Sequence, residues 1–254
     1  MKLEVLGCGG GVGQGQRTTS FLIDELILLD AGSGVGELSI TQLEAIDHVF
    51  LTHAHLDHTA FLPFLLDTVL GRRQAPVVVH ALAETIAVLK AHIFNWQVWP
   101  DFNQIPSLEH PLLQYAPLVV GETVNVGKTR ITALPARHSV PALGYLIEGE
   151  GGGIAFSGDT THNDAFWHAL NQVQNLQHLI IETAFSNADI ELAKLSCHLC
   201  PSLLLKGLDL LQSRPRVWIT HLKPGEADSI MNDIEQLQHP LAPQALQHGQ
   251  TITL

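Results

Sequence analysis

Positive charge is scarce in this sequence. Its 254 residues include 13 lysines and arginines against 25 aspartates and glutamates, so that the formal net charge is −12. A protein that holds nucleic acid needs lysines and arginines to neutralise the phosphates. The composition therefore argues against stable nucleic-acid binding, although a bound dication could still attract a small anionic substrate.

Cysteines and long apolar segments are also few. Three cysteines, Cys8, Cys197 and Cys200, cannot build a disulfide framework, and the segment CHLC at 197–200 has no second CxxC pair. No apolar run approaches the roughly 20 residues that cross a bilayer. The N-terminal segment 1–7 is too short and too acidic for a secretion signal and is typical of a first strand. We therefore expect a cytoplasmic protein without membrane contact.

Strand-like and helical runs alternate along the chain, and no repeat or linker divides it, so we expect a single domain over residues 1–254. Strands are predicted at 3–7, 20–23, 26–29, 48–52, 122–126, 129–134, 143–148, 154–156, 178–182 and 216–220. Helices are predicted at 59–70, 83–98, 164–174, 201–212 and 227–237. Prolines mark 100–117 as a loop-rich insertion. The pattern predicts an α/β fold with sheets covered outside by helices.

A glycine-rich segment at 7–15 matches neither GxGxxG nor GxxxxGK, and it leads into another strand instead of a helix. We interpret it as a tight loop between strands that could border an active site.

The segment HAHLDH at 53–58 is the most informative part of the sequence. Residues two apart on an extended segment point the same way, so His53 and His55 project together. The following turn can bring Asp57 and His58 back towards them. Three imidazoles and one carboxylate within six residues suit Zn²⁺ or a similar borderline metal.

Three further ligand-type residues follow predicted strands. His138 comes after 129–134, Asp159 after 154–156, and His221 after Thr220. Together with the HAHLDH segment they form an ordered set of seven residues, and such a set favours a site for a second metal ion.

These residues resemble the motifs of the metallo-β-lactamase superfamily. The resemblance rests on HAHLDH at 53–58, His138, GDT at 158–160, ITH at 219–221 and LDAG at 29–32. It implies a four-layer αβ/βα sandwich with a dinuclear site at the sheet edges. His53, His55 and His138 would bind one metal ion, Asp57, His58 and His221 the other, and Asp159 would bridge them. Two Zn²⁺ ions are implied, with Mn²⁺ or Fe as alternatives; a histidine at 55, where the di-iron branch has Glu, favours hydrolytic zinc.

A narrower resemblance to class II cyclic-nucleotide phosphodiesterases spans residues 1–235. HIFNWQVWP at 92–100 looks like their HxFNxxxWP segment, LSCHLCP at 195–201 like LxGHLTP, and ITHLKP at 219–224 like ITHIKP, with Cys197 in place of Gly and Cys200 in place of Thr. The resemblance implies hydrolysis of 3′,5′-cyclic AMP to 5′-AMP through a dinuclear metal-bound hydroxide. A small cyclic nucleotide would be the partner, and a homodimer is a family-based expectation.

Three residues are candidates for catalysis. Asp57 could accept a hydrogen bond from the hydroxide, and His198 is the candidate proton donor to the departing 3′ oxygen, because imidazole titrates near neutral pH. Glu182, at a strand end, could orient His198. Thr52 and Thr160 are expected to fix ligand orientation through hydrogen bonds.

The substrate-binding candidates are Phe94, Asn95, Trp96 and Trp99. On the predicted helix 83–98 the aromatic residues have helical spacing and offer flat surfaces for adenine. Asn95 could bind a base or ribose edge.

Four alternatives remain open from sequence. One is a tRNA 3′-processing endonuclease, which shares a late histidine comparable to His198 but needs a basic patch that this chain lacks. The others are a thioester hydrolase of the glyoxalase II type, a phosphodiesterase acting on another small ester, and a non-catalytic metal-binding scaffold. Turnover of cyclic nucleotides against precursor tRNA would separate them.

Overall fold

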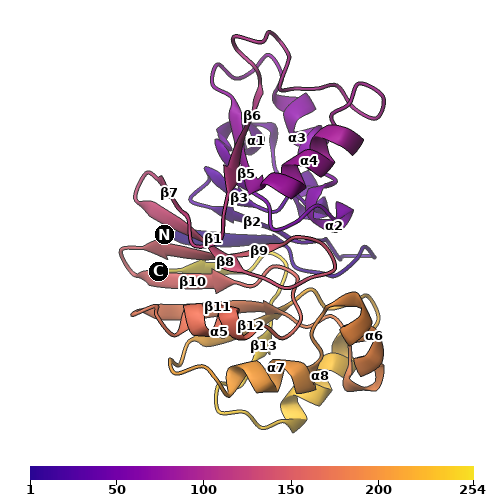
Figure 1. The fold of residues 1–254 in the computed structure, drawn as a ribbon, viewed down its shortest axis with the longest axis vertical. Helices are drawn as coiled ribbons and strands as arrows, with labels where there is room; N and C mark the ends of the chain where they lie inside the picture. The colour runs from indigo at the N-terminus through magenta and orange to yellow at the C-terminus, as the bar shows by residue number, and fades with distance from the viewer.

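Two seven-stranded sheets face each other in the computed structural model, which describes residues 1–254 (Figure 1). In order across the first sheet the strands are β14 (Thr251–Thr253), β1 (Lys2–Gly7), β2 (Ser20–Ile23), β3 (Ile27–Leu29), β4 (His48–Phe50), β5 (Val77–Leu82) and β6 (Leu113–Leu118). The second sheet has the order β13 (Gln244–Ala245), β12 (Arg216–Thr220), β11 (Leu176–Glu182), β10 (Gly152–Phe156), β9 (Leu143–Gly149), β8 (Thr129–Pro135) and β7 (Thr123–Val126).

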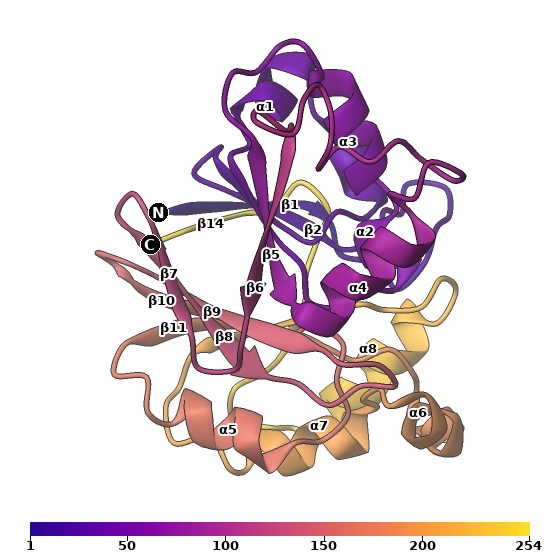
Figure 2. The same cartoon turned by 45° about the horizontal axis from the view of Figure 1, so that its top comes forward.

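Helices cover the outer face of each sheet. The first half of the chain contributes the 3₁₀ helix η1 (Ser33–Glu37), α1 (Ile40–Ala45), α2 (Leu56–Thr59), α3 (Leu62–Val69) and α4 (Ala83–His92). The second half contributes α5 (Asp164–Leu170), η2 (Asn187–Asp189), α6 (Ile190–Ser196), α7 (Pro201–Leu208) and α8 (Ala227–Gln236). Figure 2 shows the two helical layers on opposite sides of the paired sheets. No helix has the length and apolar character needed to cross a bilayer.

Three apolar clusters hold these layers together. One lies between the first sheet and its helices, one between the second sheet and its helices, and one between the two sheets. Alternation along β12 illustrates the arrangement: Val217 and Ile219 belong to the helix-facing cluster, whereas Trp218 packs against the inter-sheet cluster. The predicted four-layer αβ/βα sandwich is confirmed.

Strand direction places several loop segments at one end of the sandwich. In the second sheet β8 and β10 are each antiparallel to β9, and β10, β11 and β12 are mutually parallel. In the first sheet β3, β4 and β5 are parallel. Carboxyl ends of parallel strands are where α/β proteins usually place ligands.

Some predicted elements differ from the structure. The helix predicted at 83–98 ends at His92, and the insertion predicted at 100–117 contains most of β6. The strands β5, β13 and β14 have no counterpart among the predicted elements. The predicted helix 59–70 is two helices, α2 and α3, joined at Ala60 and Phe61.

Candidate metal centre

The HAHLDH segment leaves β4 and turns directly into α2. His53 lies in the connecting turn, His55 is the N-cap residue of α2, and Asp57 and His58 lie in its single turn. The rings of His53 and His58 are 4.3 Å apart between centroids, and those of His53 and His55 are 4.6 Å apart. The local fold therefore gathers the residues in the way that their spacing predicted.

The other predicted ligands come from the carboxyl ends of second-sheet strands. His138 follows β8, Asp159 follows β10, and His221 follows β12. Three groups of side chains lie close enough to hold a cation: His53, His55 and His138; Asp57, His58, Asp159 and His221; and His138, Asp159 and His198. The first two groups match the two predicted ligand sets, but the ligand roles themselves stay predictions.

Asp159 lies between the two groups. Its Oδ2 is 3.8 Å from His53 Nε2 of the first group. Its Oδ1 is 3.3 Å from His58 Nε2 and 3.3 Å from His221 Nδ1 in the second group. The carboxylate thus offers one oxygen to each group, as a bridging ligand would.

The nitrogens at the centre fit a metal ion in chemistry and spacing. His53 Nε2, His58 Nε2 and both ring nitrogens of His221 are buried and have no hydrogen-bond partner. Buried polar atoms in proteins are nearly always bonded to something, so these orphaned atoms indicate a missing partner. His138 Nε2 and His55 Nδ1 are 3.2 Å apart, close to the ~3.4 Å that separates ligands around a tetrahedral Zn²⁺ with bonds of about 2.1 Å.

Burial keeps several imidazoles neutral. It lowers the pKa of His53 well below the ordinary value, lowers the pKa of His55 and His138, and brings the pKa of His221 to about 3. A metal ion binds the neutral imidazole, so these groups are ready to ligate at neutral pH. Burial also lowers the pKa of His58, but Asp159 and the neighbouring Asp30 outweigh it, so the net pKa lies well above the ordinary value.

Asp30 is a functional residue that sequence reasoning did not assign. It directly follows β3, is completely buried, and its Oδ2 accepts a hydrogen bond from His58 Nδ1 at 2.7 Å. Oδ1 accepts from the backbone N–H of Thr52 at 2.7 Å. Carboxylates that bind the second nitrogen of a ligating histidine fix its orientation and its tautomer. The LDAG motif at 29–32 was the available signal, but it was used only for the resemblance.

The expected supporting hydrogen bonds of Thr52 and Thr160 are present. Thr52 Oγ1 is 3.0 Å from His53 Nδ1, and it also donates to Asp30. Thr160 Oγ1 accepts from the N–H of Arg137 at 3.0 Å, next to His138. Both threonines therefore hold the segments on which predicted ligands lie.

His198 and Glu182 form a buried pair beside the centre. His198 Nδ1 donates to Glu182 Oε1 at 2.8 Å, and the backbone N–H groups of Thr160 and Leu199 donate to the same carboxylate. The His198 ring lies 4.9 Å from the ring of His138. Burial lowers the pKa of His198, but Glu182 raises it more, so the pKa lies above the ordinary value. The pair therefore favours a protonated imidazole close to both ligand groups.

The glycine-rich loop at 7–15, which was predicted to be a tight loop that could border an active site, lies next to this centre. The N–H of His221 donates to the carbonyl of Cys8 at 2.8 Å, and a side chain at Gly10 would come within 2.5 Å of the carbonyl oxygen of His221. The loop therefore supports the backbone of a predicted ligand and has no phosphate-binding form.

The substrate-binding candidates do not share a helix face. Phe94 is only 2% exposed and packs in the first helix-facing cluster. Asn95 Oδ1 accepts from the N–H groups of Gln97 and Val98, and its Nδ2 donates to the carbonyl of Ala91. These placements argue against substrate contact for Phe94 and Asn95, because Phe94 is buried and Asn95 uses its Oδ1 and one N–H of its Nδ2 to bind the backbone of its own segment.

The two tryptophans differ from each other. Trp96 has a positive φ of 67° and is 58% exposed, whereas Trp99 is half-buried with its ring 5.1 Å from that of Phe64. Trp96 lies four residues beyond the last residue of α4, and its left-handed backbone is incompatible with the helix predicted to run to 98. Substrate contact by Trp96 and Trp99 stays a prediction.

Residues 26–236 match the family described as a beta-lactamase superfamily domain. The fold and the cluster of histidines and aspartates agree with this match, and the chain therefore belongs to the metallo-β-lactamase superfamily. The predicted resemblance to its cyclic-nucleotide phosphodiesterases is confirmed by two curated relatives. A probable 3′,5′-cyclic-nucleotide phosphodiesterase of Yersinia pestis is 32% identical over 207 residues, which cover 71% of this chain and 58% of that protein. A 3′,5′-cyclic-nucleotide phosphodiesterase of Aliivibrio fischeri is 28% identical over 251 residues, which cover 82% and 74%.

The chain thus spans less than two thirds of the Yersinia pestis protein. A ribonuclease Z of Clostridium beijerinckii is also similar, at 30% identity over 154 residues that cover 56% of this chain and 47% of that protein. Among solved structures, unliganded yeast PDE1 has a TM-score of 0.80 at 18% identity, with 100% of this chain and 99% of that chain covered. YhfI of Bacillus subtilis has a TM-score of 0.79 at 18% identity, with 99% of each chain covered. At these identities the structural likeness establishes the fold alone.

Proposed function

We propose that this chain is a metal-dependent phosphodiesterase that hydrolyses 3′,5′-cyclic AMP, or a close cyclic nucleotide, to the 5′-nucleotide. The observation that carries the proposal is the joining of two ligand groups by Asp159 with the His198–Glu182 pair beside them. The two relatives named as cyclic-nucleotide phosphodiesterases support this choice of substrate.

The seven predicted ligands would hold two divalent cations, Zn²⁺ first and Mn²⁺ or Fe as alternatives. When bound, the ions would activate a water molecule and neutralise charge on the phosphoryl oxygens. Asp57, whose side chain is partly exposed and whose Oδ2 is 3.8 Å from both His58 and His221, would be both a ligand and a hydrogen-bond acceptor at the open side of the centre.

His198 would supply the proton that the leaving group needs. Its Nδ1–H is bonded to Glu182, which leaves Nε2–H as the proton for the 3′ oxygen when the bond between that oxygen and phosphorus breaks. Glu182 keeps the imidazole oriented, and its charge favours the imidazolium before the transfer. The proton returns from solvent after the nucleotide leaves.

A ribonuclease Z-like activity is the second candidate, and it too is favoured by relatives and by the His198–Glu182 pair. Against it stands the net charge of −12, which weakens attraction to RNA.

We further infer that residues 1–254 form one domain, that the protein is cytoplasmic and makes no membrane contact, and that it forms a homodimer.

The test is turnover by metal-loaded protein with cyclic AMP, cyclic GMP, a chromogenic phosphodiester and precursor tRNA. We expect cyclic AMP to be converted to 5′-AMP and not to 3′-AMP. Cleavage of precursor tRNA without conversion of either cyclic nucleotide would replace the proposal with the ribonuclease alternative.

A further inference from the structure

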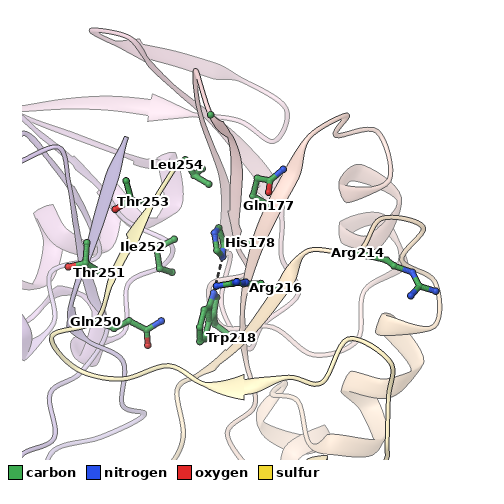
Figure 3. Close-up of a pocket in the computed structure, with 11 residues that line it drawn as sticks. Gln177, His178, Arg214, Arg216, Trp218, Gln250, Thr251, Ile252, Thr253 and Leu254 are labelled. Atoms are coloured by element: carbon green, nitrogen blue, oxygen red, sulfur yellow. Dashed lines mark hydrogen bonds between the residues drawn. The ribbon is translucent and has the colours of Figure 1, made fainter.

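A cavity of about 650 Å³ lies at the opposite end of the second sheet from the metal centre. Its walls come from β11, β12 and β14, and its lining includes His178, Arg214, Arg216 and Trp218 (Figure 3). His178 pairs with Arg216 at the start of β11 and β12, whereas Glu182 pairs with Thr220 at their ends. Four residues of strand separate the two ends by about 13 Å. The cavity is therefore distinct from the metal centre.

The charge of the cavity differs from that of the chain as a whole. Of the seven arginines, Arg17, Arg72, Arg73 and Arg130 are ion-paired with carboxylates. Arg137, Arg214 and Arg216 have no such pair, and the last two line this cavity, which no aspartate or glutamate lines. Arg216, which has no ion pair, is therefore the charged group beside the cavity that an anion could bind, and Arg214 adds positive charge to the same region of a protein of net charge −12.

Two aromatic rings beside Arg216 form a nearly flat wall. The planes of the His178 and Trp218 rings differ by 19°, and Trp218 Nε1 donates to His178 Nδ1 at 3.0 Å. The bond fixes the tautomer of the neutral imidazole, so Nε2 carries a proton and makes no hydrogen bond within the chain. In Figure 3, Arg216 lies beside these rings, whereas Arg214 lies apart from them with its guanidinium pointing away. A flat apolar surface next to donors of hydrogen bonds suits a planar ring with an anionic group.

The strand edges explain why the cavity is open. β13 pairs only with Trp218 and Ile219 of β12, so the edge of β12 at Arg216 has no neighbouring strand. Across the gap, β14 pairs with β1 and adds Thr251, Ile252 and Thr253 to the lining; in Figure 3 the side chain of Ile252 points towards His178 and Trp218, and those of the two threonines point away. The cavity volume lies within the range of about 300–1,000 Å³ that is usual for small-molecule sites.

We propose that this cavity is a second ligand site that binds a nucleoside monophosphate, with the phosphate on Arg216 and His178 and the base against the His178–Trp218 wall. This site is separate from the proposed hydrolysis. Its test measures ligand binding and does not depend on catalytic activity.

The test uses the indole N–H signal of Trp218 in ¹H–¹⁵N spectra of metal-loaded protein, assigned with the variant Trp218→Phe. AMP, inorganic phosphate and adenosine are titrated separately. We expect saturable movement of the Trp218 signal with AMP, and binding by phosphate or adenosine alone that is weaker by at least about tenfold, because each makes only part of the contacts.

Two matched arginine variants complete the test. Arg216→Gln should weaken AMP binding by at least about tenfold, since it removes a charge-assisted hydrogen bond. Arg130→Gln removes an exposed arginine from a strand outside the lining and should leave the affinity unchanged. If the Trp218 signal does not shift at saturating AMP, or if Arg216→Gln binds AMP as tightly as the unaltered protein, the proposed site is wrong. If inorganic phosphate alone binds as tightly as AMP, the aromatic wall does not contribute to binding. Loss of cyclic AMP hydrolysis would affect neither result.

Discussion

His198 and Asp30 show how individual side chains at the centre act through a bonded partner. Each is buried, and each makes a short hydrogen bond that joins a histidine to a carboxylate: Asp30 to His58 and His198 to Glu182. His198 could be identified from the sequence because its segment resembles a motif. Asp30 lies in the LDAG motif, but the motif alone did not show that its carboxylate binds a histidine 28 positions later in the chain.

Replacement of His198 by Ala tests its role as proton donor. We expect cyclic AMP turnover to fall by about 10²–10⁴-fold, the usual contribution of general acid catalysis. Metal content should be unchanged, and a chromogenic diester with a good leaving group should lose much less activity. The exposed histidine variant His110→Ala serves as the control. Equal losses for both substrates would remove His198 from the proton transfer.

Asp30→Asn tests the support of His58. Without the carboxylate, the Nδ1–H of His58 loses a charged acceptor, so we expect metal affinity to fall by about 10–100-fold. Chelator competition measures it, with the exposed Asp67→Asn as the matched control. Unchanged affinity in Asp30→Asn would show that the bond does not orient the ligand.

At the scale of elements, strands with alternating or apolar patterns were predictable and strands formed by distant pairing were not. β6 contains Pro117 and pairs only with β5, at a sheet edge where proline is tolerated, so its sequence is typical of a loop. β13 and β14 are two and three residues long and exist because β12 and β1 offer edges. The early end of α4 at His92 was missed because no glycine or proline between 93 and 98 marks the point where the backbone leaves the helix.

Asn95→Ala separates a structural role from substrate recognition. Loss of the Oδ1 acceptor leaves the N–H groups of Gln97 and Val98 without their partner, so we expect the free energy of unfolding to fall by about 1 kcal/mol. Urea denaturation measures that change, and KM for cyclic AMP should stay nearly constant. A large rise in KM at unchanged stability would instead place Asn95 in contact with substrate.

The parallel pair β4–β5 contains a pH-sensitive contact. His80 is buried against Phe50, its Nε2 is 3.0 Å from His48 Nδ1, and burial lowers its pKa to about 4. The unfolded chain has the ordinary value near 6.5, so protons bind the unfolded state better. The stabilisation is present above pH 6.5, declines as pH falls towards 4, and changes no further below that.

Acid denaturation of His80→Gln measures this contribution. Over pH 6.5 to 4 the unfolding free energy of the unaltered protein should decline by up to about 3 kcal/mol more than that of the variant. His168→Gln, an exposed histidine on α5, should decline as the unaltered protein does. Parallel curves for all three proteins would contradict the buried, neutral state of His80.

At the scale of the whole molecule, the centre joins the two halves of the chain. His53 to His58 come from the first sheet, and His138, Asp159 and His221 come from the second. The sequence predicted that these residues would lie together because they follow strands in a recognisable order, but it could not predict that the backbone N–H groups of Thr160 and Leu199 bind Glu182. A bound ion would therefore stabilise the contact between the two sheets in addition to taking part in catalysis.

Metal removal tests that link. We expect chelation to lower the melting temperature by several degrees, because a ligand that binds only the folded state stabilises it by mass action. Re-addition of Zn²⁺ or Mn²⁺ should restore the value, whereas Mg²⁺, which prefers oxygen ligands, should not. Melting curves that do not respond to chelation would indicate that these imidazoles hold no ion in the folded protein.

The pairing of β14 with β1 brings residues separated by about 250 positions into one sheet. A ribosome makes β1 about 250 residues before β14, so the outer edge of β1 stays open while the segment between them is translated. An open edge of this kind can pair with another nascent chain. Polysomes that translate this message should therefore depend on chaperones that shield strand edges until β14 has left the ribosome.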